Sequence, residues 1–327
     1  VALSRKHLCR KGACSCKINV LKSETHKVFN IFLNSKMKIA SVNVRGLMGQ
    51  LEKRHEARNA FLDFVRTENP DVVVVCEAWL AVGKNGGNIQ DSKQFLKFCE
   101  KEMVEYSKYY SLKSEKCAGI VVFSKEKVDD VYRVPYWNGR FIELTITNLR
   151  LICVCIPTSV NNMHNNSKER GMLKNVLNKR LLMLKDRNKP FIVCGDFNIV
   201  PEKGLDSLNI HAGEWGCDDT GYLEYKDWGK MLEDADAVDA YRCINGNKMS
   251  YSWVAITSGG KIRALRTNHF VVSKSVEFKE CYFLTDKAKR KEEWRHRPME
   301  YFLGNDHQPI ILNTGNESAM NYIYENE

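Results

Sequence analysis

Apolar residues along the chain alternate between short strand-like runs and segments with helical spacing. The runs KIASVNV (38–44) and DVVVVCEAW (71–79) read as strands, and between them the segment 55–69 places apolar residues at helical intervals. Pro70 ends that helix, because proline cannot continue it. The sequence therefore predicts a β-α-β order after the first 36 residues.

The same alternation continues to the C-terminal region, and no internal repeat is present. Further strands are predicted at 118–124, 140–147, 150–156, 191–194, 250–254, 269–273 and 309–312. Helices are predicted at 167–185, where five aliphatic residues from Leu173 to Leu184 follow one side, and more weakly at 222–233. Strands packed as layers with helices outside predict an α/β sandwich in which loop ends gather polar side chains at one rim.

Composition fits one large globular domain. The chain has 327 residues, of which 43% are hydrophobic and 28% charged, and its apolar runs are far shorter than the roughly 20 residues of a membrane-spanning helix. Several of the 12 cysteines lie inside strand-like runs. We interpret them as buried thiols of a reducing compartment and expect an intracellular protein that does not bind membranes.

Positive charge is concentrated at the N-terminal end. The net charge is +10, but residues 1–36 carry eight Lys or Arg and one acid, a net of +7 that leaves only +3 for the rest. We therefore expect a basic, flexible arm over 1–36, one large globular domain over 37–315 and a tail over 316–327. We expect a nuclear protein. The alternatives are that the arm is the address for a mitochondrion or another organelle, or that it precedes the true start at Met37.

Several predicted strands end in a polar residue suited to phosphate chemistry. These residues are Asn43, Glu77, Asp196 with Asn198, and Asp306 with His307. Taken singly, each has a structural explanation as a turn former, a strand end or a surface histidine. Taken together they have complementary roles: carboxylates are hard ligands for magnesium, amides hold water or phosphoryl oxygens, and histidine donates to developing charge.

A series of motifs in this order resembles the exonuclease III and apurinic/apyrimidinic endonuclease family, within the endonuclease/exonuclease/phosphatase superfamily. The motifs are SVNVRGL (41–47), CEAW (76–79), GIVVFSK (119–125), CIPTS (155–159), CGDFN (194–198), YSWV (251–254), RTNHFVVS (266–273) and NDHQPI (305–310). The resemblance covers 37–313, and the stretch 218–242 looks like the repair enzymes in particular. It implies a four-layer α/β sandwich of two packed mixed β-sheets flanked by helices, with the active site at one rim.

The resemblance also implies roles for the polar residues. Glu77 would hold the metal with Asn43 and Asp306, and Asp196 would position and deprotonate the attacking water. Asn43 and Asn198 would orient ligands, water and phosphate, while His307 would stabilise charge on the phosphoryl oxygens. The implied protein is a monomeric base-excision-repair nuclease that uses Mg²⁺, with Mn²⁺ as an alternative. Its substrate would be duplex DNA with an abasic site or a blocked 3′ end.

Four positions depart from the family pattern. Asn268 replaces the aspartate that pairs with the motif histidine, Cys155 replaces a tyrosine, Thr158 an asparagine, and Arg45 an aspartate or asparagine. We expect Asn268 to orient His307 without supplying charge, and Arg45 and Thr158 to contact DNA.

These substitutions keep two alternatives open. One is a catalytically weakened relative that binds nucleic acid or a protein partner. The other is a different superfamily branch, a retrotransposon-type endonuclease or a phosphoesterase of lipids or nucleotides, which the segment 218–242 disfavours.

Two aromatic segments are candidates for DNA contact. The segment 287–297, KAKRKEEWRHR, contains Trp294, Arg295 and Arg297 and either clamps the DNA backbone or forms a solvated, charge-balanced helix. Trp137, in the turn YWNGR, is expected to be exposed near the rim, whereas Trp253 is expected in the core.

Overall fold

The protein is described from a computed structural model. The structure describes residues 36–44, 53–78, 97–112, 119–137, 139–157, 164–202, 204–209, 219–256, 260–287 and 306–315. All of them belong to one compact unit, Leu33–Glu327. The predicted arm, except for Lys36, and the predicted tail lie outside these residues.

The first of two large sheets has six strands in the order β14-β15-β1-β2-β4-β3. Their bounds are β1 Lys38–Asn43, β2 Val72–Cys76, β3 Ser107–Ser111, β4 Ile120–Ser124, β14 Phe278–Phe283 and β15 Ile310–Thr314. β1 and β2 are parallel, and the other neighbouring pairs are antiparallel. The α-helix α1 (Lys53–Glu68) connects the parallel pair.

The second sheet repeats this plan with six strands in the order β10-β13-β8-β7-β6-β5. Their bounds are β5 Val128–Tyr132, β6 Phe141–Ile146, β7 Leu149–Cys155, β8 Phe191–Asp196, β10 Ala237–Asp239 and β13 Asn268–Ser273. Here β7 and β8 form the parallel pair, joined by the helix α3 (His164–Asp186). Both sheets are therefore mixed, with one parallel pair in the middle of each.

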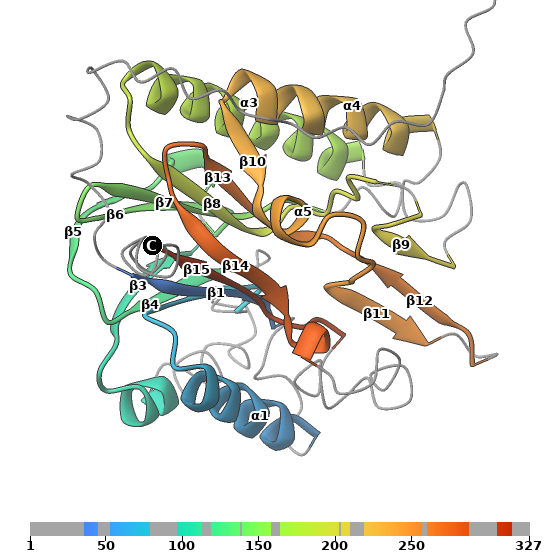
Figure 1. Ribbon diagram of the computed structural model, residues 1–327. Coiled ribbons are helices and arrows are strands. Elements are labelled where there is room, and N and C mark those ends of the chain that lie inside the picture. The colour runs from blue at the N-terminus through green and yellow to red at the C-terminus, as the bar shows by residue number, and fades with distance from the viewer. Residues whose placement is uncertain are drawn as a thin grey trace, which may run out of the picture. The chain divides into compact units, whose positions relative to one another are not determined.

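The remaining elements are short or lie outside the two sheets. They are the three-stranded sheet of β9 (Ser207–Leu208), β11 (Trp253–Ile256) and β12 (Ile262–Leu265), the helices α4 (Asp219–Asp234) and α5 (Ala240–Asn245), and the 3₁₀ turns η2 (Pro135–Trp137) and η3 (Leu284–Lys287). Figure 1 shows α3 and α4 together on one side of the sandwich and α1 on the other.

Three layers of apolar side chains hold the sandwich together. The central layer joins the facing sides of the two sheets, where Val74 of β2 and Leu151 of β7 belong to one buried cluster. A second cluster packs Phe61 of α1 against the outer face of the first sheet, and a third packs Leu177 of α3 against the outer face of the second. The predicted four-layer α/β sandwich is confirmed.

Parallel pairing gathers the candidate residues at one end of each sheet. Asn43 ends β1 beside Cys76, which ends β2 directly before Glu77, and Cys155 ends β7 beside Asp196, which ends β8. Gly195 permits this pairing: its backbone has φ of 134°, and a Cβ there would lie 1.9 Å from the carbonyl oxygen of Val154 on β7.

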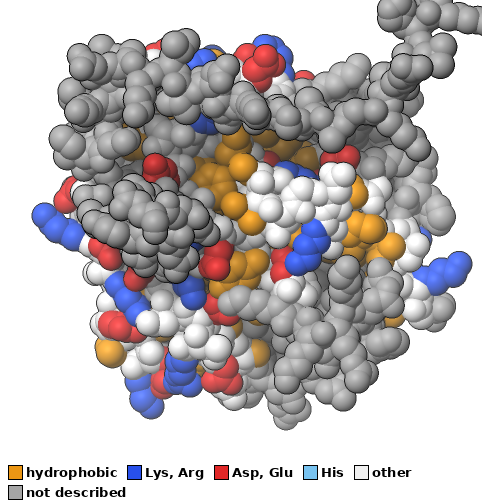
Figure 2. Space-filling model, viewed as in Figure 1, with side chains coloured by type: hydrophobic (Ala, Val, Ile, Leu, Met, Phe, Trp, Pro, Cys, Tyr) orange, Lys and Arg blue, Asp and Glu red, His pale blue; other side chains and the backbone are white. Residues whose placement is uncertain are grey.

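One sequence-based expectation about the interior is also met. The cysteines in the strand-like runs, Cys76, Cys153, Cys155 and Cys194, are free and buried. In the described part of the chain, no helix is long and apolar enough to cross a membrane. On the face seen in Figure 2, basic and acidic side chains alternate mainly at the lower left, and hydrophobic and other side chains fill much of the described centre.

Candidate functional site at the strand ends

The side chain of Asn43 links two carboxylates that are far apart in the sequence. Its Nδ2 donates to Oε1 of Glu77 at 3.1 Å and to Oδ2 of Asp196 at 2.8 Å. Asn43 is buried at the end of its strand, and the two acceptors fix the orientation of its amide. The structure thus brings three of the predicted site residues into direct contact, across the seam between the two sheets.

Two of the site residues have an unusual backbone conformation. Glu77 and Asn198 both lie in the left-handed region, with φ of 52° and 50°. Asparagine tolerates this region well, whereas for glutamate it is uncommon. Such conformations concentrate at functional sites, where the surrounding structure compensates their cost of about 1–3 kcal/mol.

Asn198 is fixed by hydrogen bonds from both its main chain and its side chain. Its backbone N–H donates to Oδ1 of Asp196 at 3.0 Å, which closes a local turn. Its Nδ2 donates to the carbonyl oxygen of Ile156 at 2.8 Å. Both carboxylate oxygens of Asp196 therefore accept hydrogen bonds, and the orientation of this side chain is determined.

Arg170 of α3 supports the same loops from behind. Its buried guanidinium donates to the carbonyl oxygens of Pro157 (2.6 Å), Phe197 (3.4 Å) and Asn198 (2.8 Å). It therefore ties the segment after β7 to the segment after β8. Sequence reasoning missed this residue, because an arginine in a helix that is polar on one face gives no signal of burial.

Burial and the charge of Asp196 raise the pKa of Glu77, while the Asn43 hydrogen bond, His307 and Arg140 act in the opposite direction. His307 is therefore close enough to Glu77 to interact with it electrostatically. Two neighbouring carboxylates in a mostly buried setting favour an added positive charge between or beside them.

The donor chemistry at this end fits a hard divalent cation. In the described ranges, no group of three or more His, Cys, Asp or Glu side chains is arranged to hold a metal ion. Magnesium does not require such a group, because it commonly binds through one or two carboxylates and keeps water or substrate phosphate as its other ligands. The carboxylate of Glu77 and the carboxamide oxygen of Asn43, next to the charge of Asp196, match that requirement.

The loop 306–308 is attached to the small sheet. His307 forms a β-bridge with Trp253, and Oδ2 of Asp306 accepts a hydrogen bond from Nε1 of Trp253 at 3.1 Å. The backbone N–H of Gln308 donates to the carbonyl oxygen of Ser252 at 2.9 Å. Trp253 is buried as expected, and it also supports Asp306.

Gln308 is a second residue that sequence reasoning missed. Its side chain is fully buried and donates from Nε2 to the carbonyl oxygen of Tyr251 and to Oγ1 of Thr285, while Oε1 accepts from the N–H of Thr285. Four polar contacts, including that of its main chain, therefore fix the backbone next to His307.

Asn268 lies beside Asp196 but is not connected to His307 by a described hydrogen bond. The two strands place Asn268 opposite Asp196, and the Asn268 N–H donates to Oγ of Ser252 at 3.0 Å. Nδ2 of Asn268 and Nδ1 of His307 are both buried without a hydrogen-bond partner. The pairing of Asn268 with His307 therefore stays a prediction.

Arg140 places a positive charge near the substituted position Cys155. Its Nη1 lies 3.4 Å from the carbonyl oxygen and 3.5 Å from Sγ of Cys155. Cys155 itself is inert, because its interaction with Cys76 and its burial raise the pKa of its thiol well above the ordinary value.

The prediction that Trp137 is an exposed aromatic is wrong. Trp137 is only 7% exposed, because its indole packs in the cluster between the second sheet and α3. The other predicted DNA contacts, Arg45, Thr158, Trp294, Arg295 and Arg297, lie outside the described residues.

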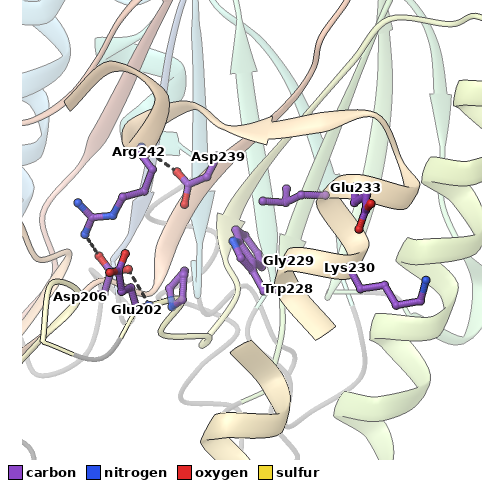
Figure 3. Close-up of a pocket in the computed structure, with 10 residues that line it drawn as sticks. Glu202, Asp206, Trp228, Gly229, Lys230, Glu233, Asp239 and Arg242 are labelled. Atoms are coloured by element: carbon purple, nitrogen blue, oxygen red, sulfur yellow. Dashed lines mark hydrogen bonds and ion pairs between the residues drawn. The ribbon is translucent and has the colours of Figure 1, made fainter. Parts of the chain in front are cut away.

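A separate hollow of about 540 Å³ lies between the loop after β8, α4 and α5, and none of its lining residues belongs to the predicted site. Figure 3 shows Arg242 and Asp206 on one side of it and Glu233 of α4 on the other. Behind it, the fully buried Arg266 donates to Asp206 and Asp239. This buried network anchors the segment that precedes Asn268.

Carboxylate, carboxamide and imidazole groups at one end of the sandwich have the chemistry to hold a metal ion and to stabilise charge on a phosphate ester. The family model described as the endonuclease/exonuclease/phosphatase family matches residues 40–244. The chain belongs to this family, whose members are nuclease and phosphatase hydrolases that generally depend on a metal.

Relatives by sequence are distant. A DNA-(apurinic or apyrimidinic site) endonuclease of Plasmodium berghei is 27% identical over 267 residues, which are 68% of this chain and 47% of that protein. An exodeoxyribonuclease of Bacillus subtilis is 27% identical over 252 residues, which are 74% of this chain and 90% of that protein. The chain thus spans about half the length of the Plasmodium relative.

Solved structures show the same fold. An AP endonuclease from Archaeoglobus fulgidus superposes with a TM-score of 0.61 at 19% identity, over 84% of this chain and 98% of that one. An AP endonuclease from Leishmania major gives a TM-score of 0.64 at 16% identity, over 86% and 88%.

Proposed function

We propose that this protein is a magnesium-dependent phosphodiesterase that cleaves DNA at abasic sites and removes blocked or terminal nucleotides from 3′ ends, in base excision repair. The single observation that carries the proposal is the Asn43 amide, which holds Glu77 and Asp196 together at the strand ends. The printed names of the relatives, an apurinic or apyrimidinic site endonuclease and an exodeoxyribonuclease, support the choice of DNA as substrate.

In this proposal each side chain has one task. Glu77 would hold the metal with Asn43 and Asp306, and a bound magnesium ion would offset negative charge that develops on the phosphate. Asp196, whose two oxygens are already oriented by hydrogen bonds, positions a water and takes its proton. Asn198 orients the phosphate, and His307 donates to a phosphoryl oxygen.

The proposal is tested with a duplex that carries one abasic-site analogue. The purified protein with Mg²⁺ is expected to nick the strand on the 5′ side of the analogue, and EDTA is expected to stop the reaction. Glu77→Gln and Asp196→Asn are each expected to abolish nicking while the circular dichroism spectrum stays that of the wild type. A wild type that is inactive with both Mg²⁺ and Mn²⁺ would contradict the proposal.

One observation favours a second candidate, a family member that binds nucleic acid without cleaving it. Asn268 is buried beside Asp196, and its Nδ2 has no hydrogen-bond partner. Members of the exonuclease III and apurinic/apyrimidinic endonuclease family have an aspartate at this position, so this protein has a neutral amide in place of a carboxylate. An inactive wild type that still binds the abasic duplex would support this candidate.

A further inference from the structure

One aromatic side chain near the site is far more exposed than its neighbours. Tyr136 is 86% exposed, the highest value among the large apolar and aromatic side chains in the described part of the chain. Single exposed hydrophobic residues are common and carry no meaning by themselves. Three features distinguish Tyr136: the hydrogen-bonded turn that carries it, its place at the same end of the sandwich as the site, and the basic residue Arg133 on the same connection.

The turn that carries Tyr136 is rigid. Tyr136 is the middle residue of η2, between Pro135, whose φ is fixed by its ring, and the buried Trp137. The N–H of Trp137 donates to the carbonyl oxygen of Val134, and the N–H of Arg140 donates to that of Trp137, each at 2.9 Å. A tyrosine has only two side-chain torsions, and here it stands on a backbone held by hydrogen bonds, so it loses little conformational entropy when it makes a contact and suits binding to another flat group.

This turn lies at the same end of the sandwich as the site. Phe141, the first residue of β6, pairs with Val154 near the end of β7, and the N–H of Cys155 donates to the carbonyl oxygen of Arg140 at 3.0 Å. The charge of Arg140 acts on Glu77 itself. Because the hydrogen bond between Trp137 and Arg140 closes a turn, their Cα atoms are within about 7 Å of each other. Tyr136 therefore lies at the same end of the sandwich as the carboxylates.

A basic residue precedes the tyrosine on the same connection. Arg133 is exposed, and its Nε donates to the carbonyl oxygen of Tyr110 on β3 at 2.8 Å. Gly139 of the same connection donates from its N–H to Oγ of Ser111 at 2.8 Å, so β3 and this connection lie side by side. An exposed ring with a nearby cation is the combination that binds unpaired nucleotides, by stacking on a base and attracting the backbone.

We propose that Tyr136 stacks on an unpaired base next to the cleaved phosphodiester, so that the preferred substrates have a single-stranded or frayed segment at the site. Bases inside a paired duplex have both faces covered by neighbouring bases, and an exposed tyrosine gains nothing from them. This inference rests on the proposed function, because it defines the substrate class of the same site.

Binding in EDTA tests the inference without cleavage. Fluorescence anisotropy gives the Kd for two labelled DNAs, a duplex in which every base is paired and a duplex with a single-stranded 3′ overhang. Tyr136→Ala is expected to weaken binding of the overhang DNA by about 5- to 100-fold, the size of one lost base-stacking contact, and to change binding of the paired duplex by less than about 2-fold. Tyr136→Phe and Tyr136→Trp keep a flat ring and are expected to retain wild-type affinity.

Tyr132 provides a matched control on the same segment. It is also partly exposed, but its ring is already covered by the guanidinium of Arg180 at 5.2 Å, so Tyr132→Ala is expected to leave both affinities unchanged. Equal effects of Tyr136→Ala on the two DNAs, or a loss with Tyr136→Phe as large as with Tyr136→Ala, would overturn the inference alone. A wild type that binds these DNAs but does not nick a duplex with an abasic analogue would overturn the proposed function alone, and one that binds neither DNA would overturn both.

Discussion

Asn43 and Asp196 are joined by a hydrogen bond of 2.8 Å although 153 residues separate them. Asn43 ends a strand of the first sheet and Asp196 ends a strand of the second. The candidate site therefore lies on the seam of the sandwich, and the packing of the two sheets determines the distance between its carboxylates.

Removal of the Asn43 amide is expected to separate the two carboxylates. Asn43→Ala leaves Glu77 and Asp196 without their shared donor, and their mutual repulsion then opposes the arrangement of the site. Loss of such a supporting contact typically reduces metal affinity or activity by about 10- to 100-fold. Rates of nicking at increasing Mg²⁺ measure the effect, and Asn175→Ala, an exposed asparagine of α3, is the control. Equal rates for Asn43→Ala and the control would show that the bridge is not needed.

Glu77→Gln is expected to stabilise the metal-free protein. Burial and Asp196 raise the pKa of Glu77, so this residue contributes stability that is fully present below the ordinary glutamate pKa of about 4.3 and is lost as the pH rises through the raised pKa. At pH 8 in EDTA, the variant should melt at a higher temperature than the wild type, because the glutamine carries no buried charge next to Asp196.

This difference is expected to shrink as the pH falls through the raised pKa, since the wild-type carboxyl is then neutral. Melting curves from pH 4 to 8 give the comparison. Added Mg²⁺ should stabilise the wild type and not the variant, because only the wild type presents the full carboxylate pair. A variant that is less stable than the wild type at pH 8 would contradict the assigned electrostatics.

Arg170→Lys is expected to reduce turnover more than substrate binding. A lysine keeps the charge but cannot reach the carbonyl oxygens of Pro157, Phe197 and Asn198 together, so the loop that carries Asn198 loses its fixed position. A fall in kcat of about 10-fold with a KM within about 2-fold would agree with this role. If the variant has a lower melting temperature and regains wild-type activity when it is assayed at a lower temperature, Arg170 has a structural role only.

Asn268→Asp is expected to raise the cleavage rate if the amide limits catalysis. The added carboxylate would lie beside Asp196 and could accept a hydrogen bond from Nδ1 of His307, which has no partner now. Single-turnover rates of the variant and the wild type at equal Mg²⁺ make the comparison. An unchanged or lower rate would show that Asn268 is not the partner of His307.

The interior of the fold was predictable from the sequence, and its edges were not. β1, β2, β4, β6, β7, β8, β13 and β15 each correspond to a predicted strand, because all or nearly all of their side chains are buried. The edge strands β3, β5, β10 and β14 were missed. In β5, for example, VDDVY has two exposed aspartates, so its pattern matches a loop as well as a half-exposed strand.

The candidate site divides in the same way. Polar residues at the ends of buried strands, such as Asn43 and Asp196, were predictable, because parallel strands bring such ends together. Arg170 and Gln308 were missed, since only the three-dimensional contacts reveal that they are buried. The choice between Trp137 and Tyr136 also needed the structure, because sequence does not indicate which of two adjacent aromatics packs inward.

The most direct test of the account is the Mg²⁺ dependence of single-turnover nicking at an abasic analogue, measured for the wild type, Glu77→Gln and Asp196→Asn. The account predicts that the wild-type rate saturates with Mg²⁺. It predicts for both variants a loss of at least about 100-fold at saturating Mg²⁺, with unchanged binding of the abasic duplex in EDTA. Cleavage by either variant at the wild-type rate would contradict the claim that these strand ends form the catalytic site.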